Sequence, residues 1–599
     1  MYTMIPKLRR FPSFPPASDR EFWAQIAAAP RLAGLLAEFG EAADGVRDRP
    51  VPALPAALYM EFRRTGNRID YETPYFERRR DLEALVVAET IEHRGRYLDA
   101  IVEYLWSILG EYTWVLPAHA FRGDKSPGLF DHLPCELFAD DDPLPPPHLP
   151  FVDLFAAETA GYLSFTLRLL GDELAGVSAN LVRAVREEIE HRVLEPTERY
   201  LDGFCAWSRG KNNWSPWCCG NLLWVANEIM TDDGRFTVFA RKLQTVIDRY
   251  LDRYAADGGC DEGPGYWQLS PGRCAFYAEG LRRASGGRID LFADPKFRAM
   301  CDYIGYAWYA GNKFASFADF GHRHQVYTGM IRMLARRSGA RQSLRMAHDY
   351  EAANGLHRQG HTGFAMTLIE LTETPVAEAE IAAAPEEFLH VYPETQQLHA
   401  RSGNFYVAMK GGHNGESHNH NDVGQFVFGA DGHLAVADLG TGTYTSETFG
   451  PRRYENWVQN GLGHNPPVFD GVPQSPGREF RAGKFAVAGT PGNFTVTCDL
   501  TPAYPAELGL TRCERRLHFD GRKLIVTDSW RATRKLALSV RLFHDGGKIE
   551  ISCAGGEAAT GQLRLDDEWL RNRWGDAIGE TRITAPAATA GEVTYTIEA

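Results

Sequence analysis

The sequence has few cysteines, and they do not form a pattern that would give them a structural or metal-binding role. Ten cysteines occur in 599 residues, and two of them are adjacent at Cys218 and Cys219. No paired C-x-x-C motifs are present, so neither a zinc ribbon nor a disulfide framework is expected. We interpret the cysteines mainly as buried thiols, which favours a reducing compartment.

The sequence also lacks long apolar runs and a net positive charge. No stretch approaches the roughly 20 apolar residues that span a bilayer, and residues 1–20 contain no apolar segment of a signal peptide. These absences predict a cytoplasmic protein without a membrane partner, or a periplasmic or secreted one if a signal peptide was removed. The formal net charge of -14 argues against nucleic acid as a partner. It is compatible with a polyanionic sugar, because arginines can gather locally in a cleft.

Hydrophobic periodicity divides the chain into two parts. A chain of 599 residues exceeds what one core supports, so at least two domains are expected. Up to about residue 385, apolar residues recur at helical spacing, and short connections separate the segments. Such helical hairpins stack as a solenoid or close into an (α/α) toroid. The clearest helices are expected at residues 20–39, on both sides of Gly95 within 80–109, and at 152–170, 181–193, 222–230 and 236–254.

After an Ala/Glu/Pro linker near Glu380, the pattern changes to an alternation with a period of two. Strands are expected at residues 405–409, 426–428, 494–497 and 524–527, with Gly-, Asn- and Asp-bearing turns between them. This pattern is typical of an antiparallel β-sandwich. The predicted domains are therefore a helical domain with an N-terminal extension (1–385) and an antiparallel sandwich (386–599).

The segment 417–422, Ser-His-Asn-His-Asn-Asp, is unusually polar for the entrance to an apolar strand. On an extended backbone His418 and His420 project to the same face, which suggests a metal ligand beside a catalytic group. Asp438 ends a second apolar strand, and His464 lies at a turn before a third. His420, Asp438 and His464 together predict a two-histidine, one-carboxylate site for Zn²⁺ or a similar divalent ion.

Three polar, aromatic segments lie in the helical part: residues 211–217 (KNNWSPW), 258–267 (GGCDEGPGYW) and 314–324 (FASFADFGHRH). The first two combine hydrogen-bonding groups with indoles. This composition favours a sugar site, because a flat ring packs against the C–H face of a pyranose while polar groups fix its hydroxyls. In the third segment, His322 or Arg323 is expected to reach the same cleft.

Taken in order, the His-Asn-His segment, the strand-end Asp and the later His-Asn pair resemble the heparinase II/III-like polysaccharide lyases. The resemblance implies an incomplete (α/α) toroid followed by an antiparallel β-sandwich, and an enzyme that cleaves uronic-acid glycans. It also implies that the predicted ligand triad holds a metal and that His418 lies in the cleft. By the same resemblance, Asn213 neutralises the substrate carboxylate, while Tyr266 and Tyr444 are catalytic.

One position departs from the family pattern. Several members have a histidine directly after the Asn, where this chain has Trp214. A mechanism that relies on an imidazole there is therefore not expected, and the chemistry falls to Tyr266 and His418.

A uronate glycan can be cut by β-elimination, which needs three groups. The carboxylate must be neutralised, a base must remove the C5 proton, and an acid must protonate the departing O4. Asn213, alone or with an arginine and His418, suits the first role, and Tyr266 suits the acid. The base is Tyr266 as phenolate, His418 or Tyr444. We expect the metal, zinc or else manganese, to be mainly structural. The predicted substrate contacts are Trp214, Glu262, Trp267, His322, Arg323 and Arg453.

Two other function classes fit part of the sequence. A toroidal glycoside hydrolase needs two carboxylates across the scissile bond, and Glu262 with Asp261 or Asp422 is the available pair. A non-catalytic carbohydrate-binding protein explains the aromatic rings but not the co-occurrence of the four predicted catalytic residues. The expected partner is an acidic polysaccharide or oligosaccharide, either a glycosaminoglycan or alginate. The sequence is compatible with a homo-oligomer.

Overall fold

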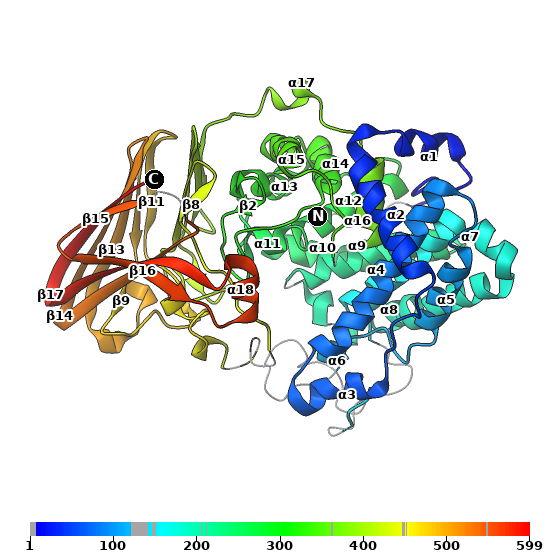
Figure 1. Ribbon diagram of the computed structural model, residues 1–599, viewed down its shortest axis with the longest axis horizontal. Coiled ribbons are helices and arrows are strands. Elements are labelled where there is room, and N and C mark those ends of the chain that lie inside the picture. The colour runs from blue at the N-terminus through cyan, green and yellow to red at the C-terminus, as the bar shows by residue number, and fades with distance from the viewer. Residues whose placement is uncertain are drawn as a thin grey trace.

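The computed structural model of the protein describes residues 7–120, 142–145, 151–204, 206–210, 212–360, 363–445, 448, 450, 452–546 and 549–599. Helices occupy one side of the molecule and strands the other (Figure 1). The helical side ends with α17 (Glu378–Ile381), and the first strand of the other side is β3 (Phe388–Tyr392). None of the described helices combines the length and apolar character needed to cross a membrane.

Helices form most of the first part, together with a small hairpin of β1 (Trp308–Ala310) and β2 (Lys313–Phe314). Whether the helices close into an incomplete toroid stays a prediction. They are α1 (Arg20–Ala27), α2 (Ala33–Arg47), α3 (Ala56–Thr65), α4 (Ile69–Glu92), α5 (Leu98–Leu109), α6 (Pro117–Ala120), α7 (Leu154–Ile189), α8 (Glu195–Phe204), α9 (Trp214–Ile229), α10 (Asp233–Arg253), α11 (Gly263–Trp267), α12 (Pro271–Ala284), α13 (Pro295–Ala307), α14 (Thr328–Ser338), α15 (Arg341–Asn354) and α16 (Phe364–Thr372).

Helical periodicity located most of these elements but missed one break. The helix expected at 20–39 is split into α1 and α2, because Pro30 lacks an N–H and begins a short 3₁₀ turn. The helices expected at 152–170 and 181–193 both fall within α7, and the break expected between them is present as a kink with non-helical dihedrals at Leu170 and Ser178. The break near Gly95 is confirmed, since that residue has a left-handed φ of 75°.

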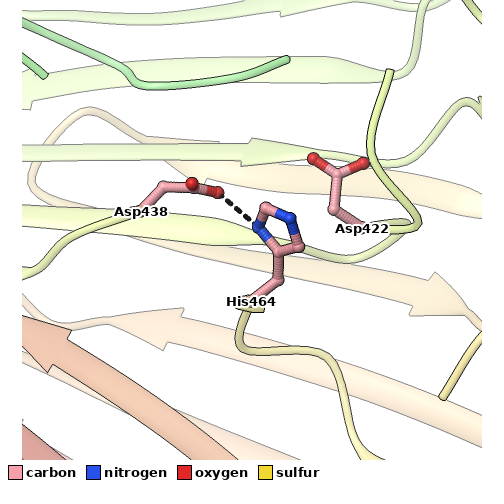
Figure 2. A group of neighbouring side chains, drawn as sticks. All are labelled: Asp422, Asp438 and His464. Carbon is pink, nitrogen blue, oxygen red and sulfur yellow. Dashed lines mark hydrogen bonds and ion pairs between the residues drawn. The ribbon is translucent and has the colours of Figure 1, made fainter. Parts of the chain in front are cut away.

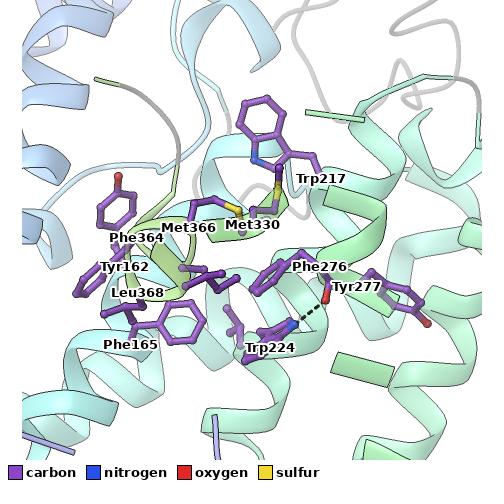
Figure 3. Close-up of a cluster of buried hydrophobic side chains, with 14 of the residues drawn as sticks. Tyr162, Phe165, Trp217, Trp224, Phe276, Tyr277, Met330, Phe364, Met366 and Leu368 are labelled. Carbon is purple, nitrogen blue, oxygen red and sulfur yellow. Dashed lines mark hydrogen bonds between the residues drawn. The ribbon is translucent and has the colours of Figure 1, made fainter. Parts of the chain in front are cut away.

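Aromatic side chains from several helices fill the core of the helical part (Figure 3). Trp224 of α9 stacks on Phe276 of α12 with ring centroids 4.6 Å apart, and its indole N–H donates to the Phe276 carbonyl at 3.0 Å. Phe165 of α7 meets Phe364 of α16 edge to face. Buried ring pairs of this kind dominate core energetics. They hold α9 firmly, and Asn213 lies at the N-terminus of this helix.

Strands form the second part. They are β3, β4 (Gln397–Ser402), β5 (Phe405–Lys410), β6 (His413–Asn414), β7 (Phe426–Ala430), β8 (His433–Val436), β9 (Val468–Phe469), β10 (Gly477–Arg481), β11 (Phe485–Thr490), β12 (Asn493–Asp499), β13 (Leu510–Phe519), β14 (Lys523–His544), β15 (Glu550–Ala554), β16 (Glu557–Arg564) and β17 (Ala577–Glu598). All their pairings are antiparallel, as predicted.

Two sheets face each other across a common core. One has the order β3–β4–β5–β7–β8. The other has the order β11–β12–β13–β14–β17–β15, with β16 beside β17 and β9 beside β14. Leu398 and Phe428 of the first sheet share a buried cluster with Val496, Leu517 and Val526 of the second. Helix α18 (Glu568–Trp574) interrupts the late strands and lies where the sandwich meets the helical part (Figure 1).

Candidate active site

The segment that carries the two histidines is a loop, which corrects the expectation of an extended strand. The strand β7 begins only at Phe426, and His418 has a left-handed φ of 56°. His418 and His420 therefore do not share one face of a strand. They still converge on a single group, the carboxylate of Asp319.

Three reactive side chains from different parts of the chain meet at this loop. The Tyr266 ring, carried by α11, stacks on the His418 imidazole with centroids 3.7 Å apart and an interplanar angle of 16°. The hydroxyls of Tyr266 and Tyr444 are 3.0 Å apart. All three side chains are partly exposed, so a ligand can reach them. Burial raises the pKa of both tyrosines above the ordinary value, and each therefore holds its proton at neutral pH.

Asp319 is the buried support beneath these groups. Its carboxylate lies 3.1 Å from His418 Nδ1 and 2.9 Å from His420 Nε2, and it accepts a hydrogen bond from Arg453 Nη2 at 2.6 Å. The side chain of Asp319 is fully buried. The Arg453 guanidinium and both imidazoles outweigh the effect of burial and hold the pKa of Asp319 well below its usual range. Asp319 is therefore a carboxylate that links the helical part to the sandwich.

Strained backbone on both sides accompanies this contact. Ala318 and His418 both have left-handed φ angles, 64° and 56°, and the Asp319 N–H donates to the His418 carbonyl at 3.0 Å. Left-handed conformations of non-glycine residues cost of order 1–3 kcal/mol and persist where the surroundings over-determine them. At Gly440, a Cβ atom would overlap the carbonyl oxygen of Phe320. The 314–324 segment therefore fits tightly against the sandwich.

Asn213 lies close to the second polar segment through a hydrogen bond to Glu262. The Asn213 backbone N–H donates to Glu262 Oε1 at 3.3 Å, and both residues are buried. Glu262 precedes α11, the helix that carries Tyr266. Burial, together with the adjacent Asp261 charge, raises the pKa of Glu262 to about 8. Glu262 is therefore largely protonated at neutral pH. Among the described residues, no hydrogen-bond partner exists for Asn213 Oδ1 or Glu262 Oε2.

The other predicted substrate contacts fall into two groups. Trp214 is partly exposed and Arg323 is exposed, so both can meet a ligand. Trp267 and His322 are fully buried: the Trp267 indole N–H donates to the Met300 carbonyl, and His322 stacks on Trp574 of α18. Arg453 is mostly buried and bonds to Asp319. Their burial favours supporting roles for these last three. Lys211 of the first segment lies outside the described residues.

Three buried residues form a cluster that could hold a metal ion (Figure 2). Asp422, Asp438 and His464 each offer a ligand atom, and these atoms lie within 4.8 Å of one another. His464 Nδ1 is 2.9 Å from Asp438 Oδ2. The cluster contains two members of the predicted triad but has Asp422 in place of His420. The Nε2 atom of His420 instead lies 2.9 Å from Asp319 Oδ1.

Buried polar atoms around this cluster fit a divalent cation. Within the described ranges, His420 Nδ1, His464 Nε2 and Asp422 Oδ2 are buried and have no hydrogen-bond partner. The His420 and His464 ring centroids are 4.9 Å apart. Imidazole nitrogens and carboxylate oxygens are ligands that suit Zn²⁺. The ammonium of Lys410 lies 2.8 Å from Asp422 Oδ1 and neutralises it, which makes His420 the stronger candidate for the third ligand.

Asp319 is the central residue that sequence reasoning missed. In the 314–324 segment, the sequence pattern indicated His322 and Arg323. The carboxylate of Asp319 instead makes the contacts to the histidine loop and Arg453. The available signal was a single charged residue between Phe317 and Phe320, both of which are buried. A carboxylate in such an apolar setting needs a cationic partner.

Comparison with known proteins confirms the resemblance. Residues 389–591 match the family model described as Heparinase II/III-like, C-terminal. No curated protein matches the sequence.

Several solved polysaccharide lyases share the fold at low sequence identity. A heparinase III structure is 13% identical with a TM-score of 0.58, covering 88% of this chain and 77% of its own. Heparan sulfate lyase HepC from Pedobacter heparinus is 12% identical with a TM-score of 0.55, covering 94% and 87%. Chondroitin AC lyase from Streptomyces coelicolor A3, solved with chondroitin sulphate, is 12% identical with a TM-score of 0.55, covering 97% and 82%.

Removal of the Asp319 carboxylate is expected to destabilise the protein strongly. Asp319→Ala leaves the buried Arg453 guanidinium without its counter-ion, so the free energy of unfolding should fall by about 3–5 kcal/mol. Asp349→Ala is the matched control, because the partly exposed Asp349 pairs with Arg345 at 3.8 Å and should cost less than about 1 kcal/mol. Denaturant unfolding measures both. Equal losses in the two variants would contradict the supporting role of Asp319.

Glu262 is expected to set an alkaline limit on activity. Its pKa in the fold, about 8, lies above the usual value, so the neutral form is favoured. Ionisation puts a buried negative charge beside Asn213. The free energy of unfolding should therefore decrease as the pH rises from the ordinary glutamate pKa to about 8. The value of kcat/KM should fall above about pH 8, where Glu262 ionises in the folded protein.

The fall in kcat/KM above about pH 8 is the alkaline limb of the pH profile. The pKa values of Tyr266 and Tyr444 are raised too far for either tyrosine to cause it. Glu262→Gln mimics the protonated acid and should move the limb to higher pH, whereas Asp261→Asn should keep a limb. An unchanged alkaline limb in Glu262→Gln would assign it to another group.

Metal binding is expected to contribute to stability rather than to the reaction. Elemental analysis of purified protein should find close to one divalent ion per chain. Chelation should lower the thermal midpoint, since a free ion at 100 times its Kd stabilises a fold by about 2.7 kcal/mol. Both His420→Ala and His464→Ala should lose the ion, while Asp422→Asn should keep it. Less than about half an equivalent of metal, with unchanged stability of His420→Ala, would refute the site.

Proposed function

We propose that this chain, whose residues 389–591 carry a heparinase II/III-like C-terminal domain, is a polysaccharide lyase that cleaves uronic-acid glycans by β-elimination. One observation carries the proposal. Tyr266 of the helical part and His418 and Tyr444 of the sandwich form one partly exposed cluster with a ring-to-ring distance of 3.7 Å and a hydroxyl-to-hydroxyl distance of 3.0 Å. The cluster places an acid and a base close together, as β-elimination requires for cleavage of a bond without water.

Tyr266 is the proposed general acid. A raised pKa keeps its phenol protonated, which suits the transfer of a proton to the departing O4. For Tyr266 to act as the base instead, a nearby cation would have to lower that pKa. The negative charge of Asp319 argues against this, because it raises the pKa of Tyr266 further and outweighs the lowering effect of Arg453.

His418 is the proposed base, with Tyr444 as the alternative. The Nδ1 atom of His418 faces the Asp319 carboxylate, so Nδ1 carries a proton and Nε2 is the atom that would accept the C5 proton. Asp319 orients the ring, as a buried carboxylate does in other histidine dyads. The partial exposure of His418 allows a sugar ring to approach it.

Asn213 is the proposed neutraliser of the substrate carboxylate. Its backbone is fixed by Glu262, and its side chain is buried at the first turn of α9. An amide N–H directed at the carboxylate strengthens its contact as charge develops in the enolate-like transition state. A protonated Glu262 avoids a competing negative charge there. A divalent ion at the Asp438–His464 cluster would supply stability to the His418 loop.

The similar solved structures and the chemistry of the site support the proposed substrate class. The relatives are named for heparan sulfate and chondroitin lyases, which favours a glycosaminoglycan, and alginate is the second candidate. The glycoside hydrolase alternative is disfavoured, because Asp422 is fully buried in an ion pair with Lys410 and Glu262 is buried against Asn213. Neither carboxyl group is placed to flank a sugar.

An absorbance assay tests the proposal. Incubation with heparin, heparan sulfate, chondroitin sulfate, hyaluronan and alginate should generate the ultraviolet absorbance of a conjugated alkene with at least one polymer. A hydrolase would release reducing ends without this absorbance. Cleavage of neutral glycans alone would refute the substrate class.

Two variants assign the chemistry. Tyr266→Phe keeps the ring stack and removes the hydroxyl, so kcat should fall at least about 100-fold with little change in KM. Asn213→Ala should lower kcat similarly. Tyr112→Phe, which alters an exposed tyrosine, should be unchanged. Near-normal turnover by Tyr266→Phe would shift the roles to His418 and Tyr444.

A further inference from the structure

A histidine outside the reactive cluster is held by a buried carboxylate. His119 lies in α6, and its Nδ1 atom is 2.6 Å from Oδ2 of Asp153, whose side chain is fully buried. Since a carboxylate only accepts hydrogen bonds, Nδ1 carries the proton and the ring orientation is fixed. Asp153 Oδ1 separately caps α7 by accepting from the Ala156 N–H at 2.7 Å. The cap therefore does not need the histidine.

The Nε2 atom of His119 takes no part in the bond to Asp153. No described residue bonds to it. The side chain of His119 is 9% exposed. With Nδ1 protonated, Nε2 is the ring atom that can accept a hydrogen bond from a ligand.

Aromatic rings surround His119, and one of them belongs to the residue that follows Asn213 in the chain. Its imidazole stacks on Phe155 with an interplanar angle of 8° and lies 4.6 Å from the Trp214 ring. Phe76 continues the row, 4.8 Å from Phe155. Trp214 directly follows Asn213, so one end of this aromatic row adjoins the residue proposed to hold the substrate carboxylate.

We propose that His119 and Trp214 form a glycan subsite beside Asn213. The partly exposed Trp214 indole packs against the C–H face of a pyranose, and His119 Nε2 accepts a hydrogen bond from one of its hydroxyls. The sugar bound there is the neighbour of the residue that Asn213 holds. This inference rests on the proposed lyase function and adds a binding determinant to it. Asp153 is a positioning residue, because it acts only through His119.

Two substitutions at His119 separate binding from scaffolding. The amide nitrogen of Asn occupies the place of Nδ1, so His119→Asn keeps the bond to Asp153 and removes Nε2. Gln places a polar group near the position of Nε2. We expect His119→Asn to raise KM about tenfold, the scale of one lost hydrogen bond, with kcat within about threefold of the parent and an unchanged thermal midpoint. His119→Gln should recover part of the affinity.

A matched control uses another histidine–carboxylate pair of the helical part. His93 lies 2.7 Å from Glu173, and His93→Asn should leave KM unchanged. An unchanged KM in His119→Asn, with an active parent, overturns the subsite and leaves the lyase proposal intact.

If the parent cleaves none of the polymers, the lyase proposal fails separately. Titration with short oligosaccharides of heparan sulfate, chondroitin sulfate and alginate, followed by calorimetry, then decides the subsite. Binding weakened about tenfold by His119→Asn supports it, and equal binding by both proteins, or no binding at all, overturns it.

Discussion

The proposed active site depends on one buried carboxylate that must be paired. Asp319 comes from a loop of the helical part, and its partners His418, His420 and Arg453 all come from the sandwich. A buried charge is tolerated only with good geometry and full pairing. Each part of the molecule therefore supplies what the other would otherwise leave as an uncompensated charge, and the reactive rings gain their positions from that requirement.

Around this contact the molecule separates reactive groups from supporting ones. Tyr266, His418 and Tyr444 are partly exposed, whereas the residues beneath them are buried and hydrogen-bonded. Their environments also move pKa values in opposite directions, raised for the tyrosines and for Glu262, and lowered for Asp319. Such divergence is typical of sites that assign acid and base roles by environment. Protons are thus held where the proposed reaction needs them.

Periodicity and motif order predicted the two kinds of secondary structure, the antiparallel pairing and the candidate residues Tyr266, His418 and Tyr444. Spacing could not reveal Asp319, because its partners lie about a hundred residues away in sequence. The left-handed backbone at His418 was equally hidden, since tertiary contacts impose it against local preference. His322 looked like a binding residue by composition, but stacking on Trp574 places it in the interior. Long-range pairing, rather than local pattern, decided each of these outcomes.

The Asp319 contact requires residues from both parts of the molecule, which limits how either part could be combined with a different partner. A sandwich domain transplanted onto a different helical partner would keep its sheets and its buried Asp438–His464 cluster, which lie within the domain. It would arrive with Arg453 and two imidazoles facing a surface that has no carboxylate. Exchange of domains at the linker would therefore leave this pairing incomplete unless the new helical partner supplied a carboxylate at the same place.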